Sequence, residues 1–173
     1  RDIDEPIRIS FIGYVRFYEN NKKFIDALGN DNRFILQFFG EGSDVLQEYS
    51  RDKGYSNVIC EGRFEPHETF KYLEKTDIIN NLYGTNDIAL DTALSIRLYY
   101  TGYLYIPILV FNGTYMQKIC NEFGIGYAIN NINDNIADDI YNWYRNINFD
   151  LFQNNCNQFI NKVKLDNERF LED

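Results

Sequence analysis

Residues 7–40 read IRISFIGYVRFYENNKKFIDALGNDNRFILQFFG. Apolar, β-prone runs occupy 7–12 and 33–39, and each run ends at a glycine. Between them, apolar side chains recur at helical spacing over residues 20–28, and Gly29 closes this segment. The connection is too long for a hairpin, so we expect two parallel strands joined by a right-handed helical crossover. The stretch therefore predicts a β-α-β unit.

The same alternation of strand and helix continues to the end of the chain, without an internal repeat. Further strands are expected at 57–60, 77–82, 106–111 and 126–129, and further helices at 43–53, from Pro66 onward, and at 87–100, 114–123, 134–145 and 149–171. The sequence thus predicts a single domain over residues 1–173. Its fold class is α/β, a Rossmann-like doubly wound parallel sheet of about six strands with C-terminal helices.

Two of the expected helices carry a clear inward face. Ser43 is a residue type that caps helix N-termini, and Pro66 is favoured at a first helical position. The side chains expected to face the core are Val45, Leu46, Tyr49, Phe70, Tyr72 and Leu73.

The composition excludes some classes of partner. The formal net charge is −9 and the pI is near 4.6, which argues against nucleic acid and against docking on an anionic membrane. A nucleotide is compatible with this charge, because a diphosphate needs only a few well-placed cations. No segment is long and apolar enough to be transmembrane. The cysteines Cys60, Cys120 and Cys156 match no metal or disulfide spacing, so we expect buried structural thiols in a reducing, cytoplasmic setting.

Ligands of open α/β sheets bind beyond the carboxyl ends of the strands, where helix N-termini favour phosphate. The loop after the first strand places Arg16, Lys22 and Lys23 near such a helix start. An Arg fork and a Lys ammonium suit a diphosphate leaving group. From composition alone, a solvated charged loop is the simpler interpretation of these cations.

Other polar motifs favour structural roles. The lone G-x-G at Gly40-Glu41-Gly42 lacks the third glycine of the dinucleotide fingerprint and indicates a tight turn. His67, the only histidine, is expected at the surface of a first helical turn rather than as a general base. Asp87 and Asp91 are expected to compensate a helix dipole. No metal site is predicted.

Five elements in a fixed order carry a family resemblance. They read FIGYVRFYENNKKFIDAL, LQFFGEG, NVICEGRFEPHETFKYLEKTDII, SIRLYYTGYLYIPILV and NEFGIGYAI. Together, the stretch from Ile9 to about Ile129 resembles the C-terminal, donor-binding domain of the large retaining GT-B glycosyltransferase family (glycosyl transferases group 1 type), whose members include capsule and lipopolysaccharide sugar transferases.

The resemblance implies transfer of a sugar from a nucleoside-diphosphate-sugar donor, with no cofactor. Arg16 and Lys22 or Lys23 would hold the diphosphate and stabilise its charge. The loop of Tyr83, Gly84, Thr85 and Asn86 would contact the sugar or the phosphates through backbone amides. The base would lie near Arg63 and Phe64. The implied donor-binding set is completed by Gly13, Tyr14, Arg97 and Tyr100.

One departure from the family pattern concerns the ribose. The family carries a glutamate seven residues before the proline of the fifth strand, and this chain has Tyr100 there, before Pro107. A tyrosine is not a bidentate acceptor for ribose hydroxyls. Arg97 keeps the basic position three residues earlier. The alternative is therefore a degenerate, non-catalytic nucleotide-binding or interaction domain. An epimerase half-domain would need a carboxylate and a histidine in the cleft, and His67 is poorly placed for this.

The resemblance also sets expectations about the whole protein. The first residues, RDIDEP, read as a linker, and the last helix has no strand after it. We expect an N-terminal acceptor domain of the same chain as partner, and no activity without it. The expected setting is bacterial polysaccharide or glycoconjugate synthesis, such as capsule synthesis. The location would be cytoplasmic, with peripheral association at the inner membrane face through the absent domain.

Overall fold

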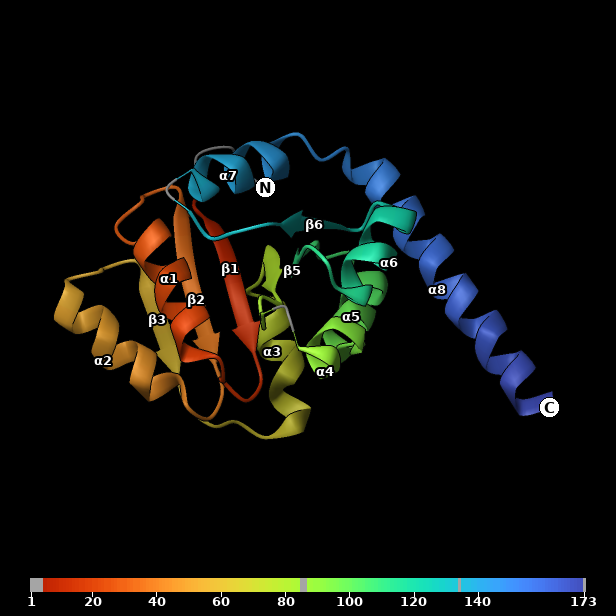
Figure 1. The fold of residues 1–173 in the computed structure, drawn as a ribbon, viewed down its shortest axis with the longest axis horizontal. Coiled ribbons are helices and arrows are strands. Elements are labelled where there is room, and N and C mark those ends of the chain that lie inside the picture. Colours follow the sequence, from red (N-terminus) through yellow and green to blue (C-terminus); the bar gives the residue numbers. More distant parts are fainter. Residues whose placement is uncertain (1–4, 85–86, 134, 173) are drawn as a thin grey trace.

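The protein is a parallel α/β sandwich, seen in a computed structural model that describes residues 5–84, 87–133 and 135–172. Six parallel strands form a single sheet in the order β3-β2-β1-β4-β5-β6 (Figure 1). This order places the reversal of the winding direction between β1 and β4. The Rossmann-like, doubly wound fold expected from the sequence is confirmed.

Strands and helices alternate along the chain, with few exceptions. The strands are β1 (Ile7–Ile12), β2 (Phe34–Phe39), β3 (Val58–Glu61), β4 (Ile78–Asn80), β5 (Ile108–Phe111) and β6 (Gly126–Ile129). The helices are α1 (Tyr18–Leu28), α2 (Ser43–Lys53), η1 (Pro66–Glu68), α3 (Thr69–Leu73), α4 (Ile88–Thr92), α5 (Ile96–Leu104), α6 (Tyr115–Phe123), α7 (Ile136–Arg145) and α8 (Phe149–Glu172). All six expected strands are present, and their bounds agree with the expected ones to within two residues.

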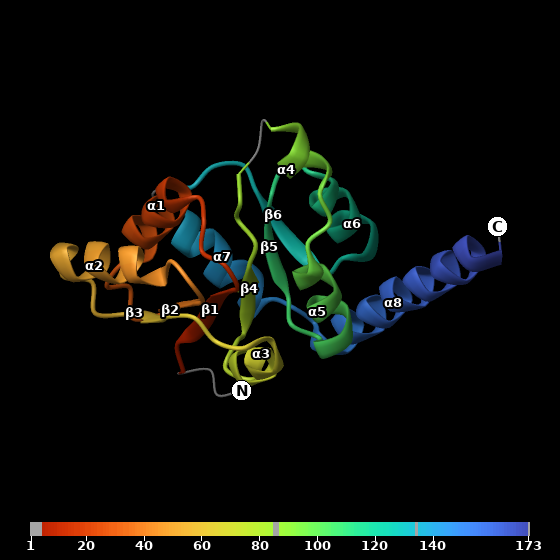
Figure 2. The ribbon, with the colours of Figure 1, turned by 90° about the horizontal axis from the view of Figure 1, so that it is seen from below.

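Two apolar layers cover the two faces of the sheet (Figures 1 and 2). On one face, α1, α2 and α7 bury side chains such as Phe24, Leu46 and Ile140 against β1 and β2. On the other face, α3, α5, α6 and α8 bury side chains such as Leu98 and Phe159. Both faces of the central strands are thus covered, and the polar side chains within them are buried too: the hydroxyl of Ser10 in β1 donates to the side-chain oxygen of Gln37 in β2 at 2.8 Å.

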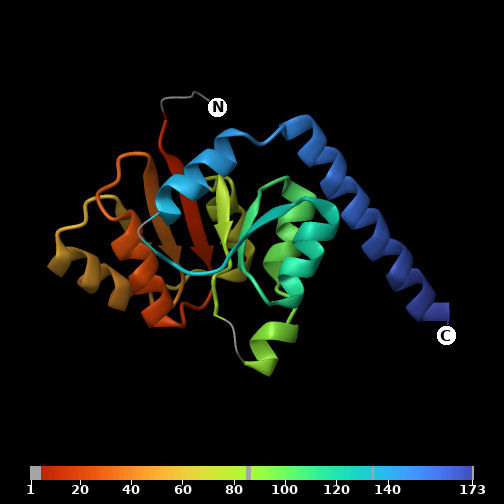
Figure 3. The ribbon, with the colours of Figure 1, turned by 45° about the horizontal axis from the view of Figure 1, so that its top comes forward.

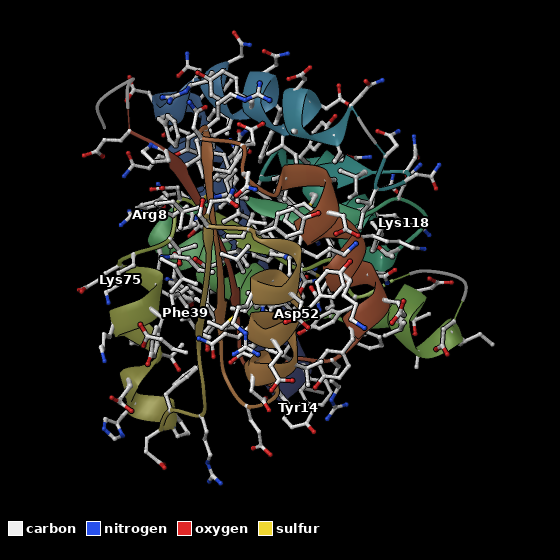
Figure 4. All side chains as sticks on the ribbon, turned by 90° about the vertical axis from the view of Figure 1, so that its left-hand side faces the viewer. Arg8, Tyr14, Phe39, Asp52, Lys75 and Lys118 are labelled. Atoms are coloured by element: carbon white, nitrogen blue, oxygen red, sulfur yellow. The ribbon has the colours of Figure 1, made fainter. Side chains whose placement is uncertain are left out.

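The β1–β4 pair fixes the crevice that this fold offers to ligands. Ile9 lies opposite Ile78 and Ser10 opposite Ile79 in the parallel register. At the amino ends, the backbone and guanidinium nitrogens of Arg8 donate to the carboxylate of Asp77 at 2.8–3.0 Å. The loops after Ile12 and after Asn80 therefore emerge side by side at the opposite, carboxyl edge, and Figure 4 shows Tyr14 well removed from Arg8.

The single helix expected at 87–100 is wrong, because the segment forms two helices. Asp87 caps α4 by accepting hydrogen bonds from the backbone N–H groups of Ala89 and Leu90. Ala93 is extended, and Ser95 caps α5 with its side chain. Two local N-caps outweigh the continuous apolar pattern, since each satisfies backbone donors that would otherwise lie free at a helix start. The short α4 lies beyond the carboxyl edge of the sheet (Figure 3).

The roles expected for Ser43 as a helix cap, and for Val45 and Phe70 as core residues, were also wrong. Gly42, with a φ of 89°, occupies the N-cap of α2, and Ser43 instead donates its hydroxyl to the carbonyl of Glu61. Val45 and Phe70 are exposed, at 39% and 59%, although both belong to an apolar pattern. Leu46, Tyr72 and Leu73 are buried as expected, and Tyr49 is partly buried.

The last helix, α8, packs against α5 and α6 through its first half, and its C-terminal part extends past the sheet (Figures 1–3). In the described parts of the chain, none of the helices combines the length and the apolar character needed to cross a bilayer.

Candidate functional site

A cleft opens at the carboxyl edge of the sheet, where β1 and β4 end. We call it cleft A, and its volume is about 430 Å³. The loop after β1, the loop after β4, the start of α5 and the end of β5 form its walls. Its lining residues are Tyr14, Arg16, Phe17, Asn81, Tyr83, Gly84, Leu90, Ala93, Ser95, Ile96, Arg97, Val110, Phe111, Thr114 and Met116.

A second hollow, cleft B, adjoins the first and has a volume of about 470 Å³. It lies over the carboxyl ends of β1, β2 and β3 and against η1. Its lining residues are Ile12, Gly13, Tyr14, Gly40, Glu41, Arg63, Phe64, Glu65, Pro66, Thr69, Ile96, Arg97 and Tyr100. Tyr14, Ile96 and Arg97 line both clefts and so form the wall between them.

Arg97 is the cation held most firmly in this wall. Its side chain is buried, with 6% of the residue exposed. The guanidinium lies over the ring of Phe11 at 4.6 Å and over the ring of Tyr83 at 5.1 Å from the centroids. One terminal nitrogen, Nη2, donates to the backbone carbonyl of Ile12, and Nη1 lies 3.4 Å from the hydroxyl of Ser95. These contacts fix the planar group at the end of β1.

The charge of Arg97 is not neutralised by the protein around it. Among the described residues, no carboxylate pairs with it, and its Nε is buried without a hydrogen-bond partner. Burial lowers the pKa of this guanidinium to about 10, although the nearby Tyr100 raises it in part. An anion beside Nε would supply the missing acceptor and the missing negative charge. Arg97 is therefore a buried cation at the junction of the two clefts, without a carboxylate partner among the described residues.

Asn81, which the sequence analysis did not single out, lies in the wall of cleft A directly after β4. It is 6% exposed, and its Oδ1 has no hydrogen-bond partner. The signal in the sequence is a pair of amides, Asn80 and Asn81, at the carboxyl end of an otherwise apolar strand. Polar residues at this edge of a parallel sheet are well placed to meet a ligand.

The three cations expected to hold a diphosphate lie at different distances from the clefts. Arg16 lines cleft A, where its guanidinium lies over the ring of Tyr14 at 4.7 Å. Lys23 lines a smaller polar hollow beside cleft A, together with Asn20. Lys22 lines neither cleft A nor cleft B. Its ammonium lies 3.3 Å from a carboxylate oxygen of Glu19 and over the ring of Tyr49, on the side of α1 that faces α2.

The residues expected to bind the donor gather around the two clefts. Those that line cleft A are Tyr14, Tyr83, Gly84 and Arg97, and those that line cleft B are Gly13, Tyr14, Arg63, Phe64, Arg97 and Tyr100. Thr85 and Asn86 lie outside the described residues. The eight expected donor-binding residues that the structure describes thus lie together around the two clefts, on loops and a helix that are far apart in the sequence.

The structure also shows how the remaining motifs are placed, relative to the structural roles expected for them. Gly40 and Gly42 have φ values of 139° and 89°, so the G-x-G makes the expected tight turn. His67 is exposed at the start of η1, and Asp87 caps α4. Within the described residues, no three His, Cys, Asp or Glu side chains converge as metal ligands. The Cys120 and Cys156 thiols are buried and free, and Cys60 is half-buried.

Comparisons with known proteins give matches by fold but none by sequence. No protein-family model matches the chain, and no curated protein matches its sequence. Solved structures do match. HepE from Anabaena, in complex with UDP-glucose, has a TM-score of 0.67 at 10% identity, over 89% of this chain and 44% of that one. AviGT4, a glycosyltransferase involved in avilamycin A biosynthesis, has a TM-score of 0.66 at 13% identity, over 98% and 51%.

A third match differs in its coverage. The catalytic domain of a cholesterol-α-glucosyltransferase from Helicobacter pylori has a TM-score of 0.58 at 14% identity, over 91% of this chain and 96% of that one. The chain spans about half the length of HepE and AviGT4. At these identities the likeness concerns the fold, and it confirms the fold that the sequence resemblance implied: the chain has the fold of one domain of the GT-B glycosyltransferases.

Proposed function

We propose that the chain is the donor-binding domain of a glycosyltransferase and that a nucleoside-diphosphate sugar occupies clefts A and B. The observation that carries this proposal is Arg97, a buried guanidinium with an unpartnered Nε and no carboxylate partner among the described residues. It lies in the wall shared by two clefts, so a diphosphate bound to it extends one end of the ligand into each. The likeness to HepE, solved with UDP-glucose, supports the same class of ligand.

The chemistry we propose for this site is stabilisation of a leaving group. When the bond between the sugar and the diphosphate breaks and an acceptor oxygen bonds to the sugar, negative charge accumulates on the departing nucleoside diphosphate. Arg97 and Arg16 are the cations that line cleft A, and they would stabilise this charge. Lys23 would contribute from the adjoining hollow. Lys22 is the weakest of the expected candidates, because it is engaged with Glu19 and Tyr49.

A complete transferase also needs an acceptor site. The chain matches about half of HepE and of AviGT4, so we propose that a second domain supplies the acceptor site across the carboxyl edge of the sheet. The biological setting that we propose is synthesis of a polysaccharide or glycoconjugate. Closure of such a two-domain cleft would exclude water from the reacting groups.

A second candidate function is nucleotide binding without catalysis. The specific observation behind it is Tyr100, which lines cleft B where the family resemblance leads us to expect a carboxylate. A phenol offers one hydroxyl, whereas a carboxylate accepts from both hydroxyls of a ribose. A domain of this kind would still bind phosphate at Arg97.

An NMR titration distinguishes ligand binding from a domain that has lost it. UDP and GDP are added to the ¹⁵N-labelled chain up to millimolar concentration. Donor binding predicts localised backbone amide shifts at Gly13, Tyr83, Gly84 and Arg97. Absence of shifts at millimolar UDP and GDP would contradict both the transferase and the nucleotide-binding proposals. Transfer itself is then sought with UDP-glucose or GDP-mannose, after the chain is combined with its acceptor domain.

A further inference from the structure

Two neighbouring asparagines at the end of β4 have opposite hydrogen-bonding states. The Oδ1 atom of Asn80 accepts a hydrogen bond from the backbone N–H of Leu82 at 3.0 Å. The backbone N–H of Asn81 donates to the carbonyl of Leu109 at 3.0 Å, which anchors the residue between strands. The Oδ1 atom of Asn81 is nevertheless buried without a partner. Both residues are buried, so burial alone does not explain the difference.

An unpartnered carbonyl oxygen inside a protein is a costly feature. Burial removes it from water, and without a hydrogen bond that loss is not offset. Almost all buried polar groups in native proteins have partners, so an exception calls for an explanation. Here the atom belongs to a residue that lines cleft A. A ligand that brings an O–H or N–H group into this cleft would satisfy it.

The other short polar side chains that line cleft A are already engaged. The hydroxyl of Thr114 donates to the carbonyl of Phe111 at 2.8 Å and accepts from the backbone N–H of Gln117 at 3.2 Å. The hydroxyl of Ser95 accepts from the backbone N–H of Arg97 at 3.3 Å and faces its Nη1. Among these short polar side chains, the one whose oxygen has no hydrogen-bond partner is therefore Asn81.

The position of Arg97 decides which end of the ligand meets Asn81. A diphosphate at the shared wall directs one end into cleft A and the other into cleft B. Cleft B is lined by the aromatic side chains of Phe64 and Tyr100 and by Arg63, which suit the flat face of a nucleobase. Cleft A is lined by Asn81, whose buried amide oxygen has no partner, and an acceptor of this kind suits a hydroxylated ring.

From this arrangement we infer that Asn81 recognises the donor sugar, by accepting a hydrogen bond from one of its hydroxyl groups in cleft A. The inference rests on the proposed function, because it takes the diphosphate to lie at Arg97. It makes Asn81 a specificity-determining residue for the sugar, while the nucleoside diphosphate is bound without it.

Calorimetry with UDP, UDP-glucose, GDP and GDP-mannose tests this role. The quantity of interest is the affinity for each nucleotide sugar divided by the affinity for its nucleotide alone. Asn81→Leu, which keeps the size but removes the acceptor, should lower this ratio for the preferred sugar about tenfold. Asn81→Asp, which keeps an acceptor, should give a ratio within about threefold of the wild-type ratio. Asn112→Leu, an exposed asparagine that lines neither cleft, should leave the ratio unchanged.

A second measurement uses only the wild-type chain, so it does not depend on whether a variant folds. In the wild-type chain, the side-chain amide signal of Asn81 should shift with the nucleotide sugar and stay in place with the nucleotide alone. If nucleotides bind but the ratio is the same in Asn81→Leu, or this signal responds equally to both ligands, the role of Asn81 is overturned and the proposed function stands. If no nucleotide binds the wild-type chain at millimolar concentration, the proposed function and this inference fail together.

Discussion

Gly13 and Arg97 lie so close that a Cβ atom on the glycine would come 2.7 Å from Nη2 of the arginine. Gly13 follows β1 with a φ of 123°, a backbone conformation that residues with a side chain rarely adopt. Its N–H donates to the carbonyl of Phe39 at 2.8 Å, which holds the turn to the end of β2. The glycine thus leaves the space in which the guanidinium lies between the two clefts.

Gly13→Ala tests this packing. The substitution introduces backbone strain and a clash with Arg97, so we expect a loss of about 2–3 kcal/mol in the free energy of unfolding, measured by urea denaturation. Gly54→Ala is the matched control, since Gly54 also has a positive φ, of 72°, but has no atoms within 4 Å of its virtual Cβ. It should cost about 1 kcal/mol. Equal losses in both variants would show that contact with Arg97 adds nothing.

Arg97→Met tests how much the buried charge of Arg97 contributes to the free energy of unfolding. A buried cation without a carboxylate partner contributes little to stability, so the variant should keep the wild-type free energy of unfolding at pH 7 within about 1 kcal/mol, or exceed it. A loss above about 2 kcal/mol would show that the guanidinium has a structural role instead.

The pH dependence of Arg97 has a definite sign. Burial lowers its pKa to about 10 in the folded protein, below its ordinary value in the unfolded chain, so above about pH 10 the unfolded chain binds more protons. The free energy of unfolding of the wild type should therefore rise as the pH increases above about 10, relative to Arg97→Met. Urea denaturation of both proteins across this range isolates the difference. Parallel curves would contradict a depressed pKa.

Asp77→Ala tests the clasp at the amino ends of β1 and β4. The carboxylate accepts three hydrogen bonds from Arg8 and its side chain is only 8% exposed, so we expect a loss of about 2–3 kcal/mol. Asp166→Ala removes the exposed pair with Lys162 on α8 and should change the stability by less than about 0.5 kcal/mol. Both values come from denaturant titration. Similar effects of the two substitutions would refute the assigned difference in burial.

The three thiols should react slowly in the native protein. Burial raises the pKa of Cys60, Cys120 and Cys156 to about 12, so the thiolate fraction at pH 8 is small. A colorimetric thiol reagent should modify them at rates limited by unfolding, and all three at once in denaturant. The thiol pKa is higher in the folded protein than in the unfolded chain, so the unfolded chain loses these protons first. The free energy of unfolding therefore falls as the pH rises above about 9. Fast native modification of Cys60 would contradict this.

The sequence predicted the strands well because each is a short apolar run that ends where the backbone must turn. Gly13, Gly40 and Gly84 mark the carboxyl edge of the sheet, and all three have positive φ values. The helix expected at 87–100 failed because Ser95 is a better cap than an interior residue, and its neighbours gave no sign of which role it takes.

The site was predicted in outline and not in detail. Loops that follow parallel strands meet at one edge, so Tyr14, Gly84 and Arg63 could be expected there from sequence order alone. That Lys22 faces α2 whereas Arg97 lies buried between the clefts depends on the tertiary packing of α1 and α5, which sequence spacing does not encode. The unpartnered oxygen of Asn81 is likewise a property of the folded interior.

The central claim is that Arg97 holds the diphosphate of a nucleotide sugar, and calorimetry on two matched variants tests it most directly. Arg97→Met removes the cation between the clefts, and Lys22→Met removes one on the side of α1 that faces α2. For UDP or UDP-glucose, whichever binds the wild type, we expect Arg97→Met to lose at least about tenfold in affinity. Lys22→Met should stay within about twofold of the wild type. Unchanged affinity in Arg97→Met, in a protein that remains folded, would contradict the account.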